Sequence, residues 1–338
     1  MNVRAPCQTA NPAPPRVAGS IRRTSSIDIA WPDGMQGDRI LDGRVRDLLT
    51  PAGGGAPITL GDATMRTILD FEKHITAIAA EPAPAALHKL VGERGGGHLR
   101  LVIRETMPEL VAEGAPLYLV LDDISGVSLV SSWAWSLWHP EWMADLRKAM
   151  PQDQIDKYND RAGVCWGLKP GNSGLSDEAT RGEVGTADGG ELRNPQDLLG
   201  WHAFPDIEGI SMRRARRIDI VPDADAGVIR IDSAFQDSAP RPEGGRAALH
   251  EYCLSAVVDA ASLEILSLDP EPRVLPFPEC PGAVANTARL VGARLPDIRD
   301  AVLENLRGPE GCTHLNDALR ALADVPALIA KMEAAACR

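Results

Sequence analysis

Two similar stretches decide the fold prediction: RRTSSIDIAWPD at residues 22–33 and RRARRIDIVPD at residues 213–223. In each stretch a pair of arginines is followed, after three residues, by Ile-Asp-Ile and then by Pro-Asp. Self-similarity of this kind is the sequence signature of a repeated structural unit. It indicates that the chain consists of two related halves.

The similarity continues in the same order beyond these two stretches. Chance could supply any one of the further matches, and generic strand and turn composition is the alternative explanation, but the conserved order favours an internal duplication. The matched segments are Leu41-Asp42 and Asp47 with Ile231-Asp232 and Asp237, Ile75 to Ile78 with Leu263 to Leu266, Glu81-Pro82 and Pro84 with Asp269-Pro270 and Pro272, Leu90-Val91-Gly92 and Arg94 with Leu290-Val291-Gly292 and Arg294, and Leu121-Asp122-Asp123 with Leu315-Asn316-Asp317.

Each half is expected to contain strands first and a helix last. Short alternating or β-branched runs, bounded by Asp, Pro and Gly, are typical of strands with tight connections. Strands and helices that are segregated along the chain favour an α+β fold over a β-α-β alternation. We therefore predict two pseudo-repeated halves around an antiparallel or mixed sheet. The predicted divisions are a flexible tail at 1–20, a first half at 21–130, a tryptophan-rich insertion or lid with a loop at 131–212, and a second half at 213–338.

Composition limits the possible partners and the compartment. The chain of 338 residues is 44% hydrophobic, which is ordinary for a globular protein, and its net charge of -12 provides no general basic field for nucleic acid or anionic lipid. The six cysteines include no closely spaced pair, so reduced thiols are expected. No apolar run approaches the roughly 20 residues of a membrane-spanning helix, and the first 19 residues lack the apolar core of a signal peptide. We therefore expect a cytoplasmic protein without a membrane partner.

The insertion contains the most distinctive candidate for ligand contact. Six of the seven tryptophans lie there, and their alternating and then helical spacing brings several indoles together. Indoles provide flat apolar walls with one polar tip, so the expected partner is a small aromatic substrate flanked by Trp133, Trp135 and Trp138. His139 or Glu141 could move a proton there. The alternatives are core packing and a subunit interface, which would make the protein a homodimer.

Two histidines are the main candidates for chemistry. His314 lies in Gly311-Cys312-Thr313-His314-Leu315, at the predicted start of a helix that Thr313 can cap, where backbone donors favour an anion or a thiolate. His250 precedes a predicted strand and is a candidate general acid or base. A metal set of His250, Cys280, Cys312 and His314 has suitable residue types, but its spacing is unlike that of structural zinc sites. Buried structural roles for these side chains are the alternative.

The run Leu119-Val120-Leu121-Asp122-Asp123 is predicted to be a strand that ends in two carboxylates. Asp122 is therefore a candidate acid or base, although carboxylates at such positions often cap the next turn. Tyr118 in the same run is expected to contact the substrate or to fill the core. Arg44 could hold a substrate carboxylate by its bidentate fork.

At the Gly-Cys-Thr-His-Leu signature the sequence resembles a bacterial family of unknown function whose shorter members share several landmarks. In this chain the landmarks are Arg22-Arg23, Asp47, His250, Cys280-Pro281 and residues 311–315. The tryptophan-rich insertion lies outside the resemblance. The family supplies no established activity. Long proteins of this type are associated with the catabolism of lignin-derived aromatic dimers, in which cofactor-free lyases occur.

The resulting hypothesis is a carbon-carbon lyase that needs no cofactor and acts on a phenolic or aryl substrate, such as a phenylcoumaran, by decarboxylation or loss of formaldehyde. His250, His314 and Asp122 would move protons, and no metal would be bound. A metal-dependent hydrolase with His and Cys ligands is the second hypothesis. The third is a binding or assembly protein without enzymatic activity.

Overall fold

A computed structural model describes residues 6–150, 152, 155, 160–176 and 184–336 of the chain. Three expectations fall partly outside these residues: the first five residues of the predicted tail, positions 177–183 of the predicted loop, and the thiol of Cys337.

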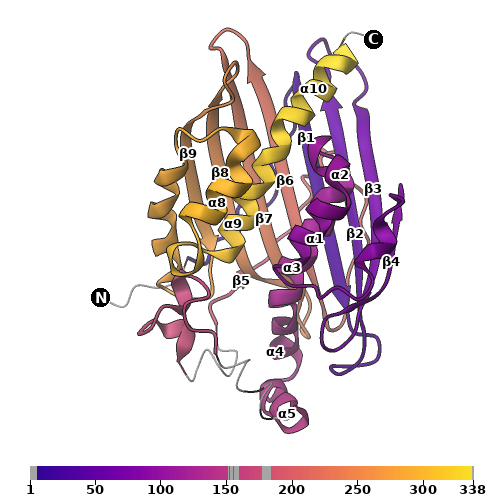
Figure 1. Cartoon of the computed structure of the whole chain (residues 1–338), viewed down its shortest axis with the longest axis vertical. Helices are drawn as coiled ribbons and strands as arrows, with labels where there is room; N and C mark the ends of the chain where they lie inside the picture. Colours follow the sequence, from indigo (N-terminus) through magenta and orange to yellow (C-terminus); the bar gives the residue numbers. More distant parts are fainter. Residues whose placement is uncertain (1–5, 151, 153–154, 156–159, 177–183, 337–338) are drawn as a thin grey trace.

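The described residues form one antiparallel sheet of nine strands with helices on one face (Figure 1). Its order is β4-β3-β2-β1-β6-β7-β8-β5, and β9 also pairs with β8. The predicted α+β class is confirmed. The strands are β1 (Ser20–Ala30), β2 (Arg39–Thr50), β3 (Ile58–Leu69), β4 (Ile75–Glu81), β5 (Ala187–Asp188), β6 (Ser211–Asp223), β7 (Val228–Pro240), β8 (Arg246–Asp259) and β9 (Ile265–Val274).

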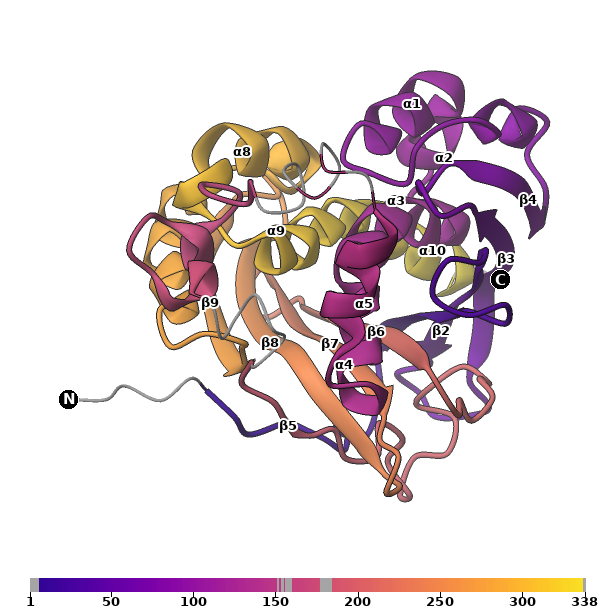
Figure 2. The same cartoon turned by 90° about the horizontal axis from the view of Figure 1, so that it is seen from below.

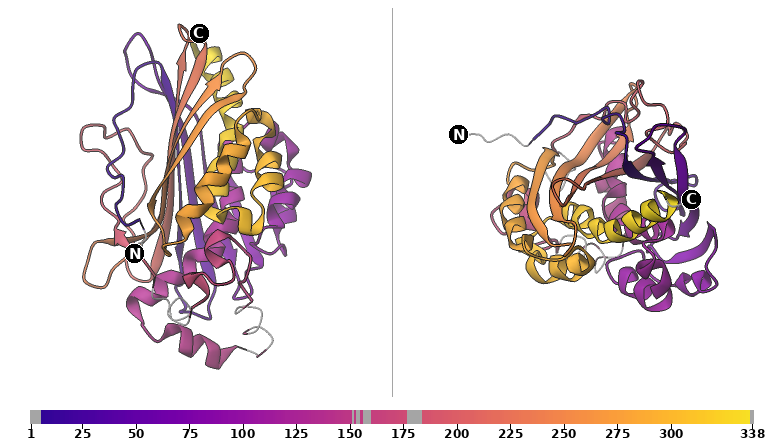
Figure 3. Two further views of the ribbon diagram at one scale, coloured as in Figure 1. Left: turned by 90° about the vertical axis from the view of Figure 1, so that its left-hand side faces the viewer. Right: turned by 90° about the horizontal axis from the view of Figure 1, so that it is seen from above.

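Most of the helices cover one face of this sheet, which we call the helix face, while α4 and α5 lie beyond one end of the strands (Figure 1 and Figure 3). The opposite face is crossed by two irregular segments, and we call it the strap face. The helices are α1 (Leu99–Thr106), α2 (Pro108–Ala112), α3 (Pro116–Val130), α4 (Ala134–Trp138), α5 (Trp142–Ala149), α8 (Ile298–Asn305), α9 (Thr313–Arg320) and α10 (Val325–Ala336), with the 3-10 helix η5 at Cys280–Leu290. None of the helices in the described ranges is both long and apolar enough to span a bilayer.

The two halves have the same strand topology. Each is a four-stranded antiparallel meander, β1 to β4 or β6 to β9, and the halves join where β1 pairs antiparallel with β6. The pairing places Arg22 opposite Asp219 and Asp28 opposite Arg213, so the two halves exchange equivalent contacts. The sheet therefore has an approximate twofold axis between β1 and β6.

One of the predicted matches between the halves has the wrong register. The amide of Ile75 donates to the carbonyl of Glu93, and the amide of Ile265 donates to the carbonyl of Ala293, so Ile75 corresponds to Ile265 rather than to Leu263. In both halves the residue two positions earlier adopts a left-handed conformation, with φ of 72° at Lys73 and 63° at Leu263. The shared turn geometry, rather than the side-chain pattern, aligns this part of the repeat.

The Arg-Arg motif serves both faces of the sheet, because successive side chains of a strand point to opposite sides. Arg23 and Arg214 lie on the helix face, where they bind Asp47 at 2.8 Å and Asp237 at 2.9 Å respectively. Buried charges of this kind are tolerated only when they are paired. The matched Asp47 and Asp237 are therefore the partners of the second arginine in each half.

On the strap face, Arg22 and Arg213 bind Asp219 and Asp28 across the axis, each at 2.8 Å. The same guanidinium groups donate to carbonyls of the two irregular segments, Arg22 to Pro14 and Arg213 to Pro205. The repeat thus extends upstream of both strands, into segments that we call the N-terminal strap (residues 6–19) and the central strap (residues 197–210).

Each strap lies across the strand region of the other half. Within the stretch predicted to be a tail, the N-terminal strap forms a bridge from Cys7 to Val274 of β9 and donates the amide of Ala10 to Glu251 of β8. The central strap carries His202, which hydrogen-bonds Ser26 and Thr24 of β1 at 2.8 and 3.0 Å. Figure 2 shows the N-terminal segment running beneath the sheet toward β5.

His202 is expected to make the fold sensitive to acid. Burial, and then the nearby guanidinium groups of Arg46 and Arg213, lower its pKa from 6.5 to about 3. As the pH falls below 6.5, the unfolded chain takes up a proton that the folded chain refuses, so stability is lost from there down to about pH 3. The test is His202→Asn, which introduces the residue that the N-terminal strap has at position 11. Between pH 7 and pH 5, we expect the free energy of unfolding of this variant to fall by about 2 kcal/mol less than that of the unchanged protein. Urea unfolding at both pH values measures this difference, and an identical pH dependence would contradict it.

Candidate functional site

The two predicted histidines meet on the helix face of the second half. His250 lies on β8 opposite Asp237 of β7, and His314 lies in the first turn of α9, which covers these strands. Their rings stack with centroids 3.6 Å apart and an interplanar angle of 16°. The two residues expose only 6% and 7% of their surface, so the pair is almost removed from water.

Asp237 faces both imidazoles. Its Oδ2 lies 3.6 Å from Nδ1 of His250 and 3.8 Å from Nε2 of His314. These distances exceed hydrogen-bonding range, and neither nitrogen has a hydrogen-bond partner in the part of the chain that the structure describes. Each imidazole therefore keeps one nitrogen free for a proton, next to a carboxylate that would stabilise the resulting charge.

The electrostatics keep the imidazoles neutral and the carboxylate ionised. Burial lowers the pKa of both histidines, and the neighbouring His250 ring lowers that of His314 further. Burial alone would raise the pKa of Asp237, but the Arg214 guanidinium and His250 outweigh it and hold this pKa well below its ordinary value. At neutral pH each imidazole is therefore in its base form, and the fixed negative charge of Asp237 favours the imidazolium that forms when a substrate proton is transferred to it.

Arg214 anchors the site. It binds both oxygens of Asp237, at 2.8 and 2.9 Å, and reaches Asp317 of α9 at 3.1 Å. Gly126 of α3 makes room for it, because a Cβ at that position would lie 2.0 Å from Nη1 of Arg214. The guanidinium thus connects β6, β7 and α9 beneath α3.

The corresponding place in the first half has the anchor without the histidines. Arg23 and Asp47 pair as Arg214 and Asp237 do, but the residue opposite Asp47 is Gly61, where the second half has His250. A Cβ at Gly61 would lie 3.2 Å from Cγ of Pro116, so this position is closed by α3. The arginine-aspartate pair is therefore common to both halves, whereas the imidazole pair belongs to the second half alone.

The predicted metal set is not assembled. The structure replaces its cysteines by Asp237, whose oxygen lies with nitrogens of His250 and His314 in a group of ligand atoms within 4.8 Å of one another. Cys312 Sγ is 4.0 Å from Nδ1 of His314, on the other side of the ring. Burial raises the pKa values of the thiols of Cys280 and Cys312, which keeps both protonated. Thr313 is the first residue of α9 rather than its cap, and the N-cap residue is Cys312, whose side chain makes no capping bond.

The stacking also opposes two-histidine chelation of a metal. An imidazole binds a metal through a lone pair in the ring plane, at about 2.0–2.1 Å for zinc. The ring planes of His250 and His314 are nearly parallel at a centroid separation of 3.6 Å, so an ion between them would lie far out of both planes. One ring would have to turn before both could coordinate the same ion.

Asp122 and Tyr118 do not lie at a strand end, because the apolar run that contains them is the buried helix α3. Asp122 pairs with Arg320 at 2.7 Å and Arg100 at 3.4 Å, and it accepts the hydroxyl of Tyr118 at 3.3 Å. Burial, followed by the charge of Asp122, raises the pKa of Tyr118 to about 12. These residues belong to the buried ionic network that joins α3 to α9.

Several tryptophans of the insertion belong to an apolar cluster that includes one end of β7. Trp133 and Trp135 are buried in the same cluster as Ala239 of β7, and Trp135 packs edge-on against Trp31 at 6.0 Å. Trp138 is half-buried and donates its indole N–H to the carbonyl of Pro240. His139 is exposed and stacks on Trp135 at 5.8 Å. The indoles therefore pack at the ends of β1 and β7 rather than around an open cavity.

Arg44 is remote from the imidazoles. It lies on the strap face of β2, pairs with Asp28 at 3.2 Å and leaves 28% of its side chain exposed. The residues that sequence reasoning did not assign to the site are Arg214 and Asp237. Both stand in the matched segments of the repeat, which was the available signal.

The comparisons with known proteins concern the second half of the chain. The profile of the family described as "Protein of unknown function (DUF2889)" matches residues 212–328. No curated protein matches the chain, and no solved structure does. The matched region contains Arg214, Asp237, His250 and His314, and it excludes the whole first half and the tryptophan-rich insertion. A DUF2889 domain of unknown function is thus found at residues 212–328, and it holds every member of the candidate site.

Proposed function

We propose that this protein is a cofactor-independent carbon-carbon lyase that acts on a phenolic or aryl substrate, with His250 and His314 as its proton-transfer groups. The observation that carries the proposal is the stacked pair of neutral imidazoles, each with a free nitrogen directed at the ionised Asp237. Such a pair can accept one proton and return it without a metal or an organic cofactor.

The comparison of the halves supports a chemical role for the imidazoles. The first half keeps the structural pair Arg23 and Asp47 with Gly61 where the second half has His250, so this arginine-aspartate pair forms in the sheet without an imidazole beside it. Burying two stacked imidazoles also lowers their pKa values, which disfavours the charged form and weakens the fold in acid. Groups with strongly perturbed pKa values are common at functional sites.

The surroundings favour an aromatic substrate. Asp237 and Ala239 are two residues apart on the same face of β7, a separation of about 6.8 Å along a strand. Ala239 belongs to the apolar cluster of Trp133 and Trp135. A ring that displaced part of this cluster would lie between indole walls and the imidazole pair. Both imidazoles are nearly buried, so the reaction requires the chain to open around them.

The proposed reaction needs only proton transfer. For loss of formaldehyde, one imidazole takes the proton from a CH2OH hydroxyl, the bond between that carbon and its neighbour breaks, and the electron pair enters the conjugated aryl system. The imidazolium, stabilised by Asp237, then returns the proton to the substrate. For decarboxylation, one imidazole takes the proton of the substrate's carboxyl group, the carbon-carbon bond breaks and carbon dioxide leaves, and the imidazolium returns that proton to the carbon that held the carboxyl group. The dry site strengthens each electrostatic step.

The test is a panel of phenylcoumaran acids and alcohols, with mass spectrometry for loss of carbon dioxide or formaldehyde. We expect turnover of at least one member, and a decrease by about 10²- to 10⁴-fold in His250→Gln and in His314→Gln. His74→Gln is the control, since 41% of the side chain of His74 is exposed and it lies far along the chain in the first half. No turnover of any member, or equal rates in all three variants, would overturn the proposal.

A metal-dependent hydrolase is the second candidate, and the close approach of ligand atoms from Asp237, His250 and His314 favours it. The bidentate Arg214 and the parallel rings oppose it, because both oxygens of Asp237 are already bound and the ring nitrogens do not converge. Elemental analysis of the purified protein separates the two candidates. If the purified protein contains stoichiometric zinc or iron and His250→Gln does not, the hydrolase becomes the better proposal and the lyase is rejected.

A further inference from the structure

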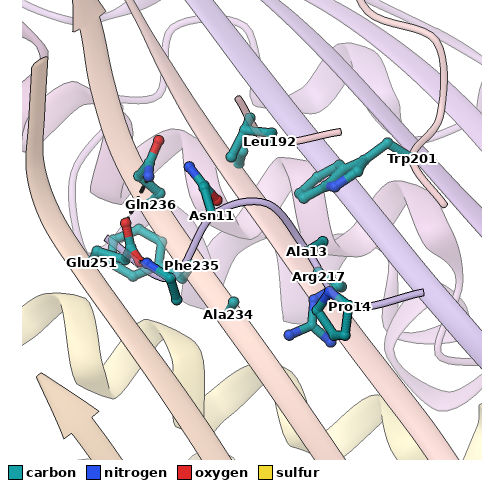
Figure 4. Close-up of a pocket in the computed structure, with 12 residues that line it drawn as sticks. Asn11, Ala13, Pro14, Leu192, Trp201, Arg217, Ala234, Phe235, Gln236 and Glu251 are labelled. Carbon is teal, nitrogen blue, oxygen red and sulfur yellow. Dashed lines mark hydrogen bonds between the residues drawn. The ribbon is translucent and has the colours of Figure 1, made fainter. Parts of the chain in front are cut away.

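A small cavity lies beneath the N-terminal strap, on the opposite side of the sheet from the imidazoles (Figure 4). The strap residues Asn11, Ala13 and Pro14 line it together with Gln236 of β7 and Glu251 of β8. Gln236 and Glu251 hydrogen-bond each other at 2.6 Å, and the cavity offers about 30 Å³ to the centres of water-sized molecules. This space suits roughly two ordered waters rather than a ligand.

A group of three thiols lies beside the start of α9. Its members are Cys165 of the tryptophan-rich insertion, Cys280 at the first position of η5, and Cys312, the N-cap residue of α9. All three are free thiols, and the proposed lyase chemistry uses none of them. The group joins three segments that are far apart in the sequence.

The backbone brings Cys165 next to Cys312. The amide of Trp166, which follows Cys165, donates to the carbonyl of Gly311, which precedes Cys312, at 2.8 Å. Standard bond lengths place the Cα atom of each cysteine less than about 3 Å from its end of this hydrogen bond. The two Cα atoms are therefore no more than about 8 Å apart, whatever the direction of the two segments.

The conformation of both cysteines suits a closer approach. Cys165 has a φ of -153° and a ψ of 178°, and Cys312 has a φ of -114° and a ψ of 127°, so both residues are extended. In an antiparallel pair of extended segments, a bond from the residue after one member to the residue before the other flanks a non-hydrogen-bonded pair. The bond from Trp166 to Gly311 has this position. The Cα atoms of such a pair are about 4.5 Å apart, within the range of about 4.4–6.8 Å that disulfides span.

The pKa of the Cys165 thiol indicates that the two side chains are also close together. Burial is the largest cause of its rise, and the charge of an ionised Cys312 is the next; together they bring this pKa to about 11. A like charge has such an effect only at short range. The thiols of Cys165 and Cys312 therefore lie near each other.

The two cysteines differ in their access to solvent. Cys165 is half-buried, whereas Cys312 is only 6% exposed. A small oxidant in solution therefore reaches Cys165 first. Cys312 is then placed to react with the oxidised sulfur.

Cys280 is the competing thiol. Its Sγ lies against the backbone of Gly167, where an added Cβ would be only 2.7 Å away, and Cys280 is 7% exposed. The charge of an ionised Cys312 is, after burial, the next cause of its raised pKa. A bond between Cys280 and Cys312 would thus join two buried thiols, neither of which an oxidant meets easily. Cys165 has the access that Cys280 lacks.

We propose that Cys165 and Cys312 are a site of reversible disulfide formation, with hydrogen peroxide as the oxidant. The Cys165 thiolate attacks one oxygen of the peroxide and becomes a sulfenic acid, and the other oxygen takes up the thiol proton and leaves as water. The thiolate of Cys312 then attacks the sulfenic sulfur, and the hydroxyl group leaves with the second thiol proton as another water. Two thiols are oxidised, and one peroxide is reduced to two molecules of water. A dithiol reductant reverses the bond.

The bond would tie the insertion to the helix that carries His314. The segment around Cys165 is closed on itself by a bond from the amide of Gly163 to the carbonyl of Leu168 at 2.8 Å, and Cys312 is two residues before His314. Because the disulfide closes a long loop, we expect it to raise the thermal midpoint of unfolding by about 5 °C. Neither the bond nor this shift depends on the proposed lyase activity.

The test is peroxide treatment of the reduced full-length protein at about pH 8.5, where more of each thiol is ionised than at neutral pH. Free thiols are then blocked with N-ethylmaleimide in denaturant, and the unreduced digest is analysed by mass spectrometry. We expect two peptides linked through Cys165 and Cys312 in most of the protein, and their separation by dithiothreitol. A link between Cys280 and Cys312 instead, or oxidation of Cys165 to a sulfinic acid without a link, would overturn the proposal.

Cys253 is the internal control. Like Cys165 it is half-buried and its pKa is raised by burial to about 11, but the charges that act on it belong to carboxylates and guanidinium groups rather than to a thiol. Cys253 should stay open to N-ethylmaleimide while Cys165 becomes linked. Cys165→Ser should abolish the link and the rise in thermal midpoint, whereas Cys280→Ser should keep both. If Cys253 is oxidised as fast as Cys165, or if Cys280→Ser no longer forms the link, the assignment is wrong.

Discussion

Arg214→Met is expected to lower the free energy of unfolding by about 3–5 kcal/mol, the usual cost of removing one partner of a buried ion pair. Asp237 would lose the guanidinium that binds both of its oxygens, while its side chain is fully buried. Asp317 would keep its ion pair with Arg100 at 2.6 Å, so the destabilisation comes mainly from the unpaired charge of Asp237. Urea unfolding followed by circular dichroism measures the change.

The corresponding substitution in the first half is the matched control. Arg23→Met removes the same contact from Asp47, but Lys331 remains 3.7 Å from that carboxylate and Arg299 still binds Asp324. We therefore expect Arg23→Met to destabilise the fold less than Arg214→Met. A loss below 1 kcal/mol in Arg214→Met, or a larger loss in Arg23→Met, would show that the pairs are not the anchors inferred here.

Asp237→Asn is expected to reduce the proposed lyase activity by about 10²- to 10⁴-fold, the range for loss of acid-base assistance. The amide has no negative charge to stabilise an imidazolium on His250 or His314. The charge of Asp237 raises the pKa values of both histidines and so counteracts the effect of burial. Once this charge is removed, both pKa values fall further. The measurements are the rate on the substrate identified from the panel and the ¹⁵N shifts of the imidazoles.

Asp47→Asn separates catalysis from stability. It breaks the matching ion pair with Arg23 in the first half, and no histidine faces it. We expect Asp47→Asn to lose about as much stability as Asp237→Asn, but to keep near-normal activity and unchanged ¹⁵N shifts of the His250 and His314 imidazoles. If both variants lose activity to the same extent, the effect is structural and Asp237 has no role in proton transfer.

Much of the architecture could be predicted from local sequence. The Arg-Arg and Ile-Asp-Ile stretches have the period of two that places alternate residues on opposite faces of a strand, and their recurrence correctly indicated two halves. The expectation of a strand at Leu119 to Asp123 was wrong, since these residues lie in α3. A short apolar run buried on all sides has no period that separates strand from helix, and only the packing between the two halves decides.

In the candidate site, too, some features could be predicted from local sequence and others depended on packing. His250 and His314 were identified as candidates because of their residue type and local setting, and the structure brings them into contact. Arg44 was plausible as a carboxylate ligand by residue type alone, but the alternation of β2 places it on the strap face with Asp28. Which face a strand residue occupies relative to a distant helix depends on the whole sheet.

The sequence by itself determined the duplicated strand pattern, the arginine and aspartate positions that recur in both halves, and the candidate histidines His250 and His314 of the second half. The tertiary structure alone decided that Asp237 faces both imidazoles, that Trp133 and Trp135 are buried in an apolar cluster with Ala239 of β7, and that each strap crosses to the other half. The reason is physical: periodicity and residue type are local properties of the chain. The distance between two side chains on separate elements depends on how β7, β8 and α9 are packed, and no local pattern records it.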